Sequence, residues 1–188
     1  MSVWVISRAA GVGALWLFAA SAVLGHAARM AVRARPGWVH PLHYLHTALA
    51  VAGWTGALVH VLLLRHDPTI PFTWKALLVP LAAPYRPFWT GLGTLALYGW
   101  GLTLVAFDAK KRVGMNVFRL LHDMAPAALG LAALHALGAG SDVRLTSLRL
   151  AAGALLALAL LIAAERLLGR RPPGSAGEVS AAGRRQGL

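Results

Sequence analysis

The most regular feature of the chain is the alternation of long charge-free stretches with short clusters of charged residues. A helix that crosses a membrane needs roughly 20 predominantly apolar residues. Stretches close to this length recur along the chain and predict five membrane helices. We expect them near residues 6–28, 41–64, 88–107, 119–138 and 147–168.

One further apolar stretch, Phe72–Tyr85, does not fit a membrane helix. Lys75 and Arg86 enclose only ten charge-free residues, and Pro80 and Pro84 interrupt them. Aromatic residues on both sides of this stretch are typical of the membrane interface. We therefore predict an interfacial or re-entrant segment here rather than a sixth span.

Composition supports a membrane protein. Hydrophobic residues make up 58% of the chain and charged residues 13%, with a mean hydropathy of +0.64. Soluble domains have about 45–50% apolar residues and about 25% charged residues. This excludes a soluble enzyme, a disordered chain and a nucleic-acid-binding protein, and the lack of cysteine excludes disulfides, iron–sulfur clusters and thiol catalysis. We expect an all-α integral membrane bundle over residues 1–168 and a disordered tail over 169–188, rich in Gly, Pro, Ser and Arg.

The basic residues are distributed unequally between the two predicted sides of the membrane. Of the 18 Lys and Arg residues, twelve lie on one side. These twelve are Arg29, Arg33, Arg35, Lys110, Lys111, Arg112, Arg119, Arg166, Arg170, Arg171, Arg184 and Arg185. The positive-inside rule places this side in the cytoplasm, so the N-terminus is expected outside and the C-terminus inside a prokaryotic-type cytoplasmic membrane. The net charge of +12 is thus a topology signal and requires no nucleic acid.

Histidine carries the candidate chemistry. Ionisable side chains within a bilayer are costly and are functional candidates by default. Four of the eight histidines lie inside predicted spans: His46 and His60 on the second helix, and His122 and His135 on the fourth. The other four lie at helix ends or in loops, where interfacial histidines are common. These are His26, His40, His43 and His66.

The four intramembrane histidines are predicted at two matched depths. The second and fourth helices run in the same direction, and their histidines are 14 and 13 residues apart, which corresponds to about 21 and 20 Å. This is the geometry for two stacked haems, each held by one histidine from each helix. Two imidazoles fill both axial positions of haem iron, which suits electron transfer because no site stays open for oxygen.

The angular positions agree with this arrangement on one helix only. His46 and His60 are about 40° apart around a straight helix, and Gly53 lies midway on the same face, where it would let two macrocycles approach. His122 and His135 are about 140° apart. Pro126 lies between them and can kink the helix, but its presence does not say whether the kink corrects the angle.

The histidine spacing and three local motifs resemble one known family. His-x13-His on one helix is followed by His-x12-His on the next but one. The motifs are Tyr85–Gly93 (YRPFWTGLG), Phe118–His122 (FRLLH) and Leu134–Asp142 (LHALGAGSD). Together they resemble the ferric reductase-like transmembrane superfamily, which includes ferric reductases and the membrane part of NADPH oxidases. The resemblance covers roughly residues 6–165.

The resemblance implies two haem b groups between these helices. The inner haem iron would be held by His46 with His122, and the outer by His60 with His135. Arg119, near the first of these pairs, could bind propionates of the inner haem or be an ordinary charge at a helix end. The implied function is transmembrane electron transfer from a cytoplasmic or quinol donor to an external acceptor, as in a ferric reductase.

The chain also departs from the larger members of this superfamily, which carry a flavin and NADPH domain after the last span. Only the short tail follows here, so we expect a separate electron donor, either a flavoprotein or membrane quinol. A short relative, the haem-binding membrane subunit of periplasmic methionine sulfoxide reductase, likewise works with a partner. Two other hypotheses stay open: a histidine-lined transporter that handles metal or protons without haem, and a structural subunit that has lost its cofactor.

Overall fold

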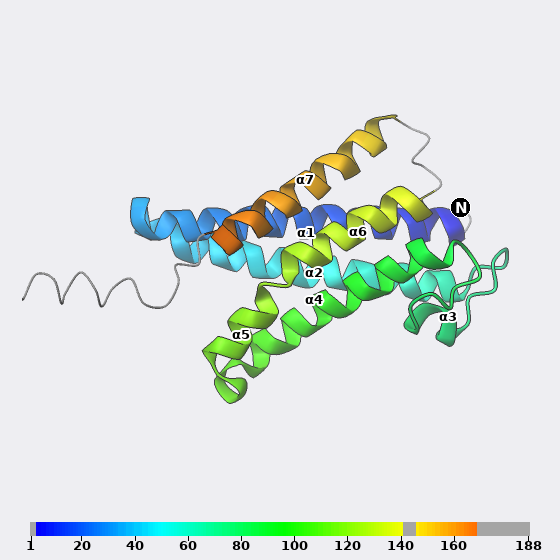
Figure 1. Cartoon of the computed structure of the whole chain (residues 1–188), viewed down its shortest axis with the longest axis horizontal. Helices are drawn as coiled ribbons and strands as arrows, with labels where there is room; N and C mark the ends of the chain where they lie inside the picture. The colour runs from blue at the N-terminus through cyan, green and yellow to red at the C-terminus, as the bar shows by residue number, and fades with distance from the viewer. Residues whose placement is uncertain (1–2, 141–145, 169–188) are drawn as a thin grey trace, which may run out of the picture.

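The structure is a computed structural model, and it describes residues 3–140 and 146–168 (Figure 1). Within these ranges every regular element is a helix, which confirms the all-α prediction. The elements are α1 (Val3–Ala34), the 3-10 helix η1 (Pro36–Trp38), α2 (Val39–Arg65), α3 (Trp74–Leu78), α4 (Pro87–Val113), α5 (Met115–His122), α6 (Ala125–Ala139) and α7 (Thr146–Leu168). The tail predicted to be disordered, 169–188, lies outside the described residues.

Among the described residues, four helical segments are long and apolar enough to cross a membrane. They are Val3–Val32, Pro36–Arg65, Pro87–Val113 and Met115–Ala139. These segments support a multi-pass membrane protein. The prediction of five spans differs from this count, because the fifth expected helix is present as α7 but is not among the four.

Several helices extend beyond the charge-free stretches that predicted them. α1 ends at Ala34 rather than near residue 28, and α4 ends at Val113 rather than near 107. Alanine, arginine and lysine are strong helix formers, so charged residues end the apolar stretch without ending the helix. α4 stops at Gly114, whose φ of 85° lies in the left-handed region that favours glycine.

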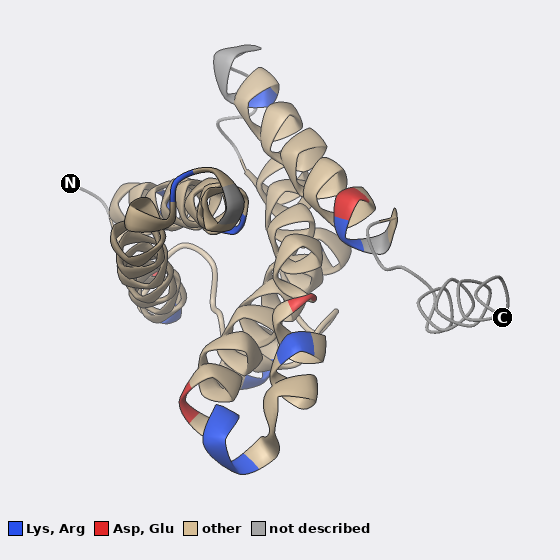
Figure 2. Cartoon of the chain, turned by 90° about the vertical axis from the view of Figure 1, so that its left-hand side faces the viewer, with Lys and Arg blue, Asp and Glu red and all other residues tan. Residues whose placement is uncertain are grey.

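The long helices form two groups. α1 packs along α2, and α4, α5, α6 and α7 form a second group in which α4 packs on α6 and α6 on α7. Between the two groups, the helix backbones approach each other mainly where α1 meets α6 and where α2 meets α4. Figure 2 shows the two groups side by side, with Lys and Arg residues gathered where α4 meets α5. The histidine-bearing helices therefore belong to different groups.

The main core lies where α1 meets α4, α6 and α7. Phe18 of α1 stacks on Trp100 of α4 with ring centroids 3.5 Å apart, and both rings are buried. Most other members are alanines, including Ala96, Ala128 and Ala133. Small residues allow close helix approach in membrane proteins, and here they leave room for the aromatic pair.

The segment predicted to be interfacial, Phe72–Tyr85, forms one short helix and turns. The Thr73 hydroxyl caps α3 by accepting a hydrogen bond from the Ala76 amide at 3.1 Å. Phe72 and Leu77 are buried against Leu64 at the end of α2. The segment thus packs on the bundle end where α2 finishes and is not a sixth long helix.

Candidate functional site

The four intramembrane histidines meet in two pairs. His46 of α2 and His122 of α5 have ring centroids 5.9 Å apart and ring planes within 2° of parallel. His60 of α2 and His135 of α6 have centroids 6.3 Å apart and planes at 70°. We call these the first and the second histidine pair. The structure therefore brings together the residues that the sequence paired by depth.

A break in the helix resolves the angular mismatch between His122 and His135. The expected single helix over 119–138 is divided into α5, which ends at His122, and α6, which begins at Ala125 with Pro126 in its first turn. Proline has no N–H, so Pro126 cannot donate to the carbonyl of His122, as an α-helix would require. The chain turns between them, and each histidine then faces its partner on α2.

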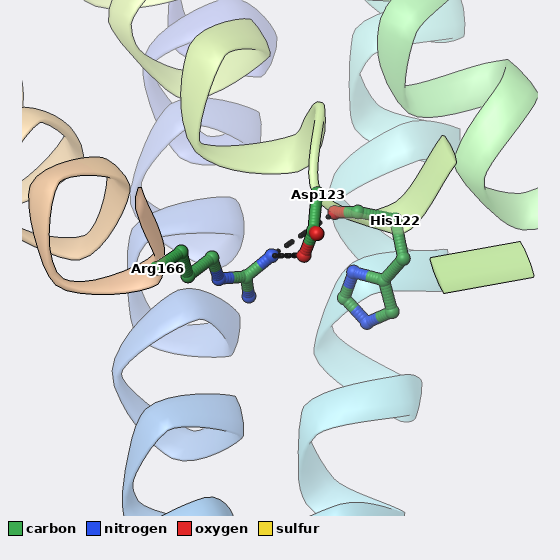
Figure 3. Close-up of polar contacts among 3 residues, drawn as sticks. All are labelled: His122, Asp123 and Arg166. Atoms are coloured by element: carbon green, nitrogen blue, oxygen red, sulfur yellow. Dashed lines mark hydrogen bonds and ion pairs between the residues drawn. The ribbon is translucent and has the colours of Figure 1, made fainter. Parts of the chain in front are cut away.

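Arg166 of α7 binds the carbonyl that Pro126 leaves free. Its Nη1 donates to the His122 carbonyl oxygen at 3.2 Å and to Asp123 Oδ1 at 3.0 Å. Figure 3 shows the guanidinium reaching the backbone of the break from α7. The end of α7 is therefore tied to the segment that positions His122.

Three of the four imidazoles are oriented by backbone carbonyls. The Nδ1 atoms of His46, His60 and His135 lie within 2.9 Å of the carbonyl oxygens of Ser21, Ser7 and Trp89, respectively. A carbonyl oxygen only accepts, so Nδ1 must carry the hydrogen in each case. The lone pair of these rings is then on Nε2, which is the nitrogen left to bind a metal.

The spacing of both pairs fits a shared metal ion. A metal–imidazole bond is about 2 Å long, and the nitrogen lies about 1 Å from the ring centre, so one ion between two imidazoles separates the ring centres by about 6 Å. The observed 5.9 and 6.3 Å match this separation. Haem iron with two axial histidines meets the same requirement.

A cavity of about 210 Å³ lies beside the second pair. His60 and His135 line it together with Gly11, Gly93 and mostly apolar side chains. Arg8 of α1 also lines it and supplies a positive charge next to the pair. A mostly apolar cavity with few polar groups is typical of a cofactor site, and an arginine suits an acidic substituent such as a propionate.

Two predicted site residues lie in surroundings other than those expected. Gly53 is buried against Phe18, whose ring atoms lie 3.2 Å from the position of a Cβ at residue 53. This glycine therefore accommodates an aromatic side chain midway between the pairs. Arg119 is exposed on α5, and the arginine bonded to the first pair's backbone is Arg166 instead.

Sequence reasoning missed the residues of α1 that contact the histidines. Ser7 and Ser21 are buried polar residues, and they are 14 residues apart, like His46 and His60. Equal spacing on two adjacent antiparallel helices was the available signal, because it allows the same contact to form twice. Arg8 and Arg166 were counted only as topology charges, and their helix neighbours could not be inferred from sequence.

No protein-family model, curated protein or solved structure matches this chain. The resemblance to the ferric reductase-like superfamily therefore stays a prediction that rests on the residues themselves. Within the described part of the chain, no group of three or more His, Asp or Glu side chains lies close enough to hold a metal ion. The four intramembrane histidines thus lie in two pairs.

Proposed function

We propose that this chain is a membrane cytochrome that holds two haem b groups and carries electrons across the bilayer. The observation that carries the proposal is the presence of two histidine pairs, whose ring centres are 5.9 and 6.3 Å apart. They connect α2 to α5 and to α6, helices whose backbones otherwise make little contact. Bound haem would supply a one-electron carrier at each level. The chain's own residues would hold each group with two imidazoles, one from α2 and one from α5 or α6.

The levels lie far enough apart to span much of the membrane. His46 and His60 are 14 residues apart on one helix, about 21 Å along its axis. The hydrocarbon core is about 30 Å thick, so two carriers at this separation would cover about two thirds of it. Electrons would enter at the first pair from a cytoplasmic flavoprotein or membrane quinol and leave at the second pair for an external acceptor, as in a ferric reductase.

Orientation follows from the basic residues in the same proposal. Lys110, Lys111 and Arg112 lie in the last turn of α4, and α5, which follows directly, carries His122 of the first pair. The positive-inside rule places this end in the cytoplasm. The first pair is then the inner one and the second pair the outer one, with the N-terminus outside.

A spectrum of the purified protein tests the proposal. We expect a b-type reduced-minus-oxidised spectrum and about two haems per chain by pyridine haemochrome assay. Because His40 is exposed at the start of α2, His40→Ala is the matched control and should keep both haems. A colourless protein from haem-replete cells would overturn the proposal, and metal or proton transport by it would favour the histidine-lined transporter.

A further inference from the structure

The imidazoles of three histidines contact neighbouring helices in one common way. Nδ1 of His60 lies 2.7 Å from the Ser7 carbonyl oxygen. Nδ1 of His46 lies 2.8 Å from that of Ser21, and Nδ1 of His135 lies 2.9 Å from that of Trp89. Each acceptor is a carbonyl inside a helix, where it also accepts from the amide four residues later.

A glycine occupies that later position in all three cases. The residues four positions after Ser7, Ser21 and Trp89 are Gly11, Gly25 and Gly93, respectively. A Cβ at these glycines would lie 2.9, 2.9 and 2.8 Å from atoms of the facing imidazole. Residue i+4 sits next to the carbonyl of residue i, so a side chain there would keep the ring from the oxygen. Glycine therefore makes each of these hydrogen bonds possible.

On α1 this arrangement of a glycine and a carbonyl that accepts from a histidine occurs twice, and the serines add a further hydrogen bond to each. The Ser7 and Ser21 hydroxyls donate to the backbone carbonyls of His60 and His46 at 3.1 and 2.9 Å. Each histidine in turn donates from Nδ1 to the same serine's carbonyl. The two helices are thus joined at both levels by the same reciprocal contact, which fixes their axial register.

His122 is the exception. Its Nδ1 is buried and has no hydrogen-bond partner among the described residues. On α4, which supplies Trp89 and Gly93 to His135, the residues 13 and 14 positions after Gly93 are Ala106 and Phe107. Neither leaves the space that a glycine leaves beside a helix carbonyl. The first pair therefore has one ring held by a carbonyl, and the second pair has two.

We propose that Gly11, Gly25 and Gly93, each with the carbonyl four residues before it, are positioning sites for the haem ligands His60, His46 and His135. Each site fixes the tautomer and the direction of Nε2 and makes the ring a stronger donor. This inference rests on the proposed function. It adds that haem retention is controlled separately at each level by residues that touch no metal.

Alanine substitutions at these glycines test the inference. Loss of a partner that orients a metal ligand typically weakens binding by about 10–100-fold. We expect Gly25→Ala to reduce haem affinity at the first level by this factor and to leave the second level intact, and Gly11→Ala to do the reverse. Gly13→Ala, on the same helix with open space around its Cβ, is the matched control and should retain both haems.

The readouts are haems per chain and the midpoint potential of each haem, in full-length protein whose helical content and monodispersity are checked. Ser21→Ala is a second variant: it removes the hydroxyl but keeps the backbone carbonyl that accepts from His46 Nδ1, so both haems and both potentials should be retained. Two haems with unchanged potentials in Gly25→Ala would overturn the inference alone, as would equal damage from Gly13→Ala. Absence of haem from the unmodified protein would overturn the proposed function, and the inference with it.

Discussion

Removal of one axial histidine should remove one haem and spare the other. In His60→Ala the second pair loses the imidazole that faces His135 at 6.3 Å. The first pair lies about 21 Å away along α2, and its ligand His46 bonds to Ser21, whereas His60 bonds to Ser7. The two levels thus share no hydrogen-bond partner in the described structure.

This separation sets the magnitude of the expected effect. Sites more than about 7–10 Å apart without shared partners usually act additively to within about 0.5 kcal/mol. An energy of that size changes an equilibrium constant by about twofold. We therefore expect His60→Ala to bind one haem per chain instead of two, with the affinity of the first level changed by no more than about twofold.

Haem titration of the purified variant, followed by its Soret absorbance, measures both numbers. His40→Ala is the control, since His40 is exposed in the first turn of α2 and its loss should leave two haems. If His60→Ala, His135→Ala, His46→Ala and His122→Ala each lost both haems while remaining folded, the levels would not be independent and the two-pair arrangement would be refuted.

Two further predictions concern the ring planes of the two pairs and the contact of Arg166 with the first pair. Ring planes at 2° in this pair and at 70° in the second should give two distinct low-spin ferric EPR signals. Parallel imidazoles split the π-type d orbitals of iron, and near-perpendicular ones do not, so two identical signals would contradict the geometry. Arg166→Ala removes the bonds to Asp123 and His122, and their loss costs about 1 kcal/mol of folding free energy for a partly exposed pair. In a thermal-unfolding assay we therefore expect Tm to fall by about 2–4 °C. Arg112→Ala is the control and should leave Tm unchanged.

Much of the fold could be predicted because membrane helices follow from hydropathy alone. Charge-free length located every long helix, since unsatisfied backbone groups are excluded from the bilayer. Helix ends were predicted less well. Lys110, Lys111 and Arg112 continue α4 beyond its apolar stretch, because hydropathy reports where the membrane ends and not where helical hydrogen bonding ends.

The pairing of the histidines could be predicted in depth but not in angle. Depth depends only on rise per residue, and 14- and 13-residue spacings give nearly equal depths. Angle depends on the local path, and Pro126 could be recognised as a perturbation without revealing its direction. The direction of the turn at Pro126 depends on a tertiary contact, the bond from Arg166 of α7 to the freed carbonyl of His122. The spacing of residues along the chain does not encode such a contact.

The histidine pairs lie between α2 and the α5–α6 segment, outside the main core that joins α1 to α4, α6 and α7, and this position gives them a structural role in addition to the proposed electronic one. Ring centres about 6 Å apart cannot touch through their nitrogen atoms, so direct imidazole contact does not join α2 to α5 and α6. A planar cofactor ligated from both sides would fill this space and join the α1–α2 helices to the helices α4–α7. A ligand that binds only the assembled state stabilises that state. Because α1 already positions His46 and His60, one half of each site would be in place before the two groups of helices are joined.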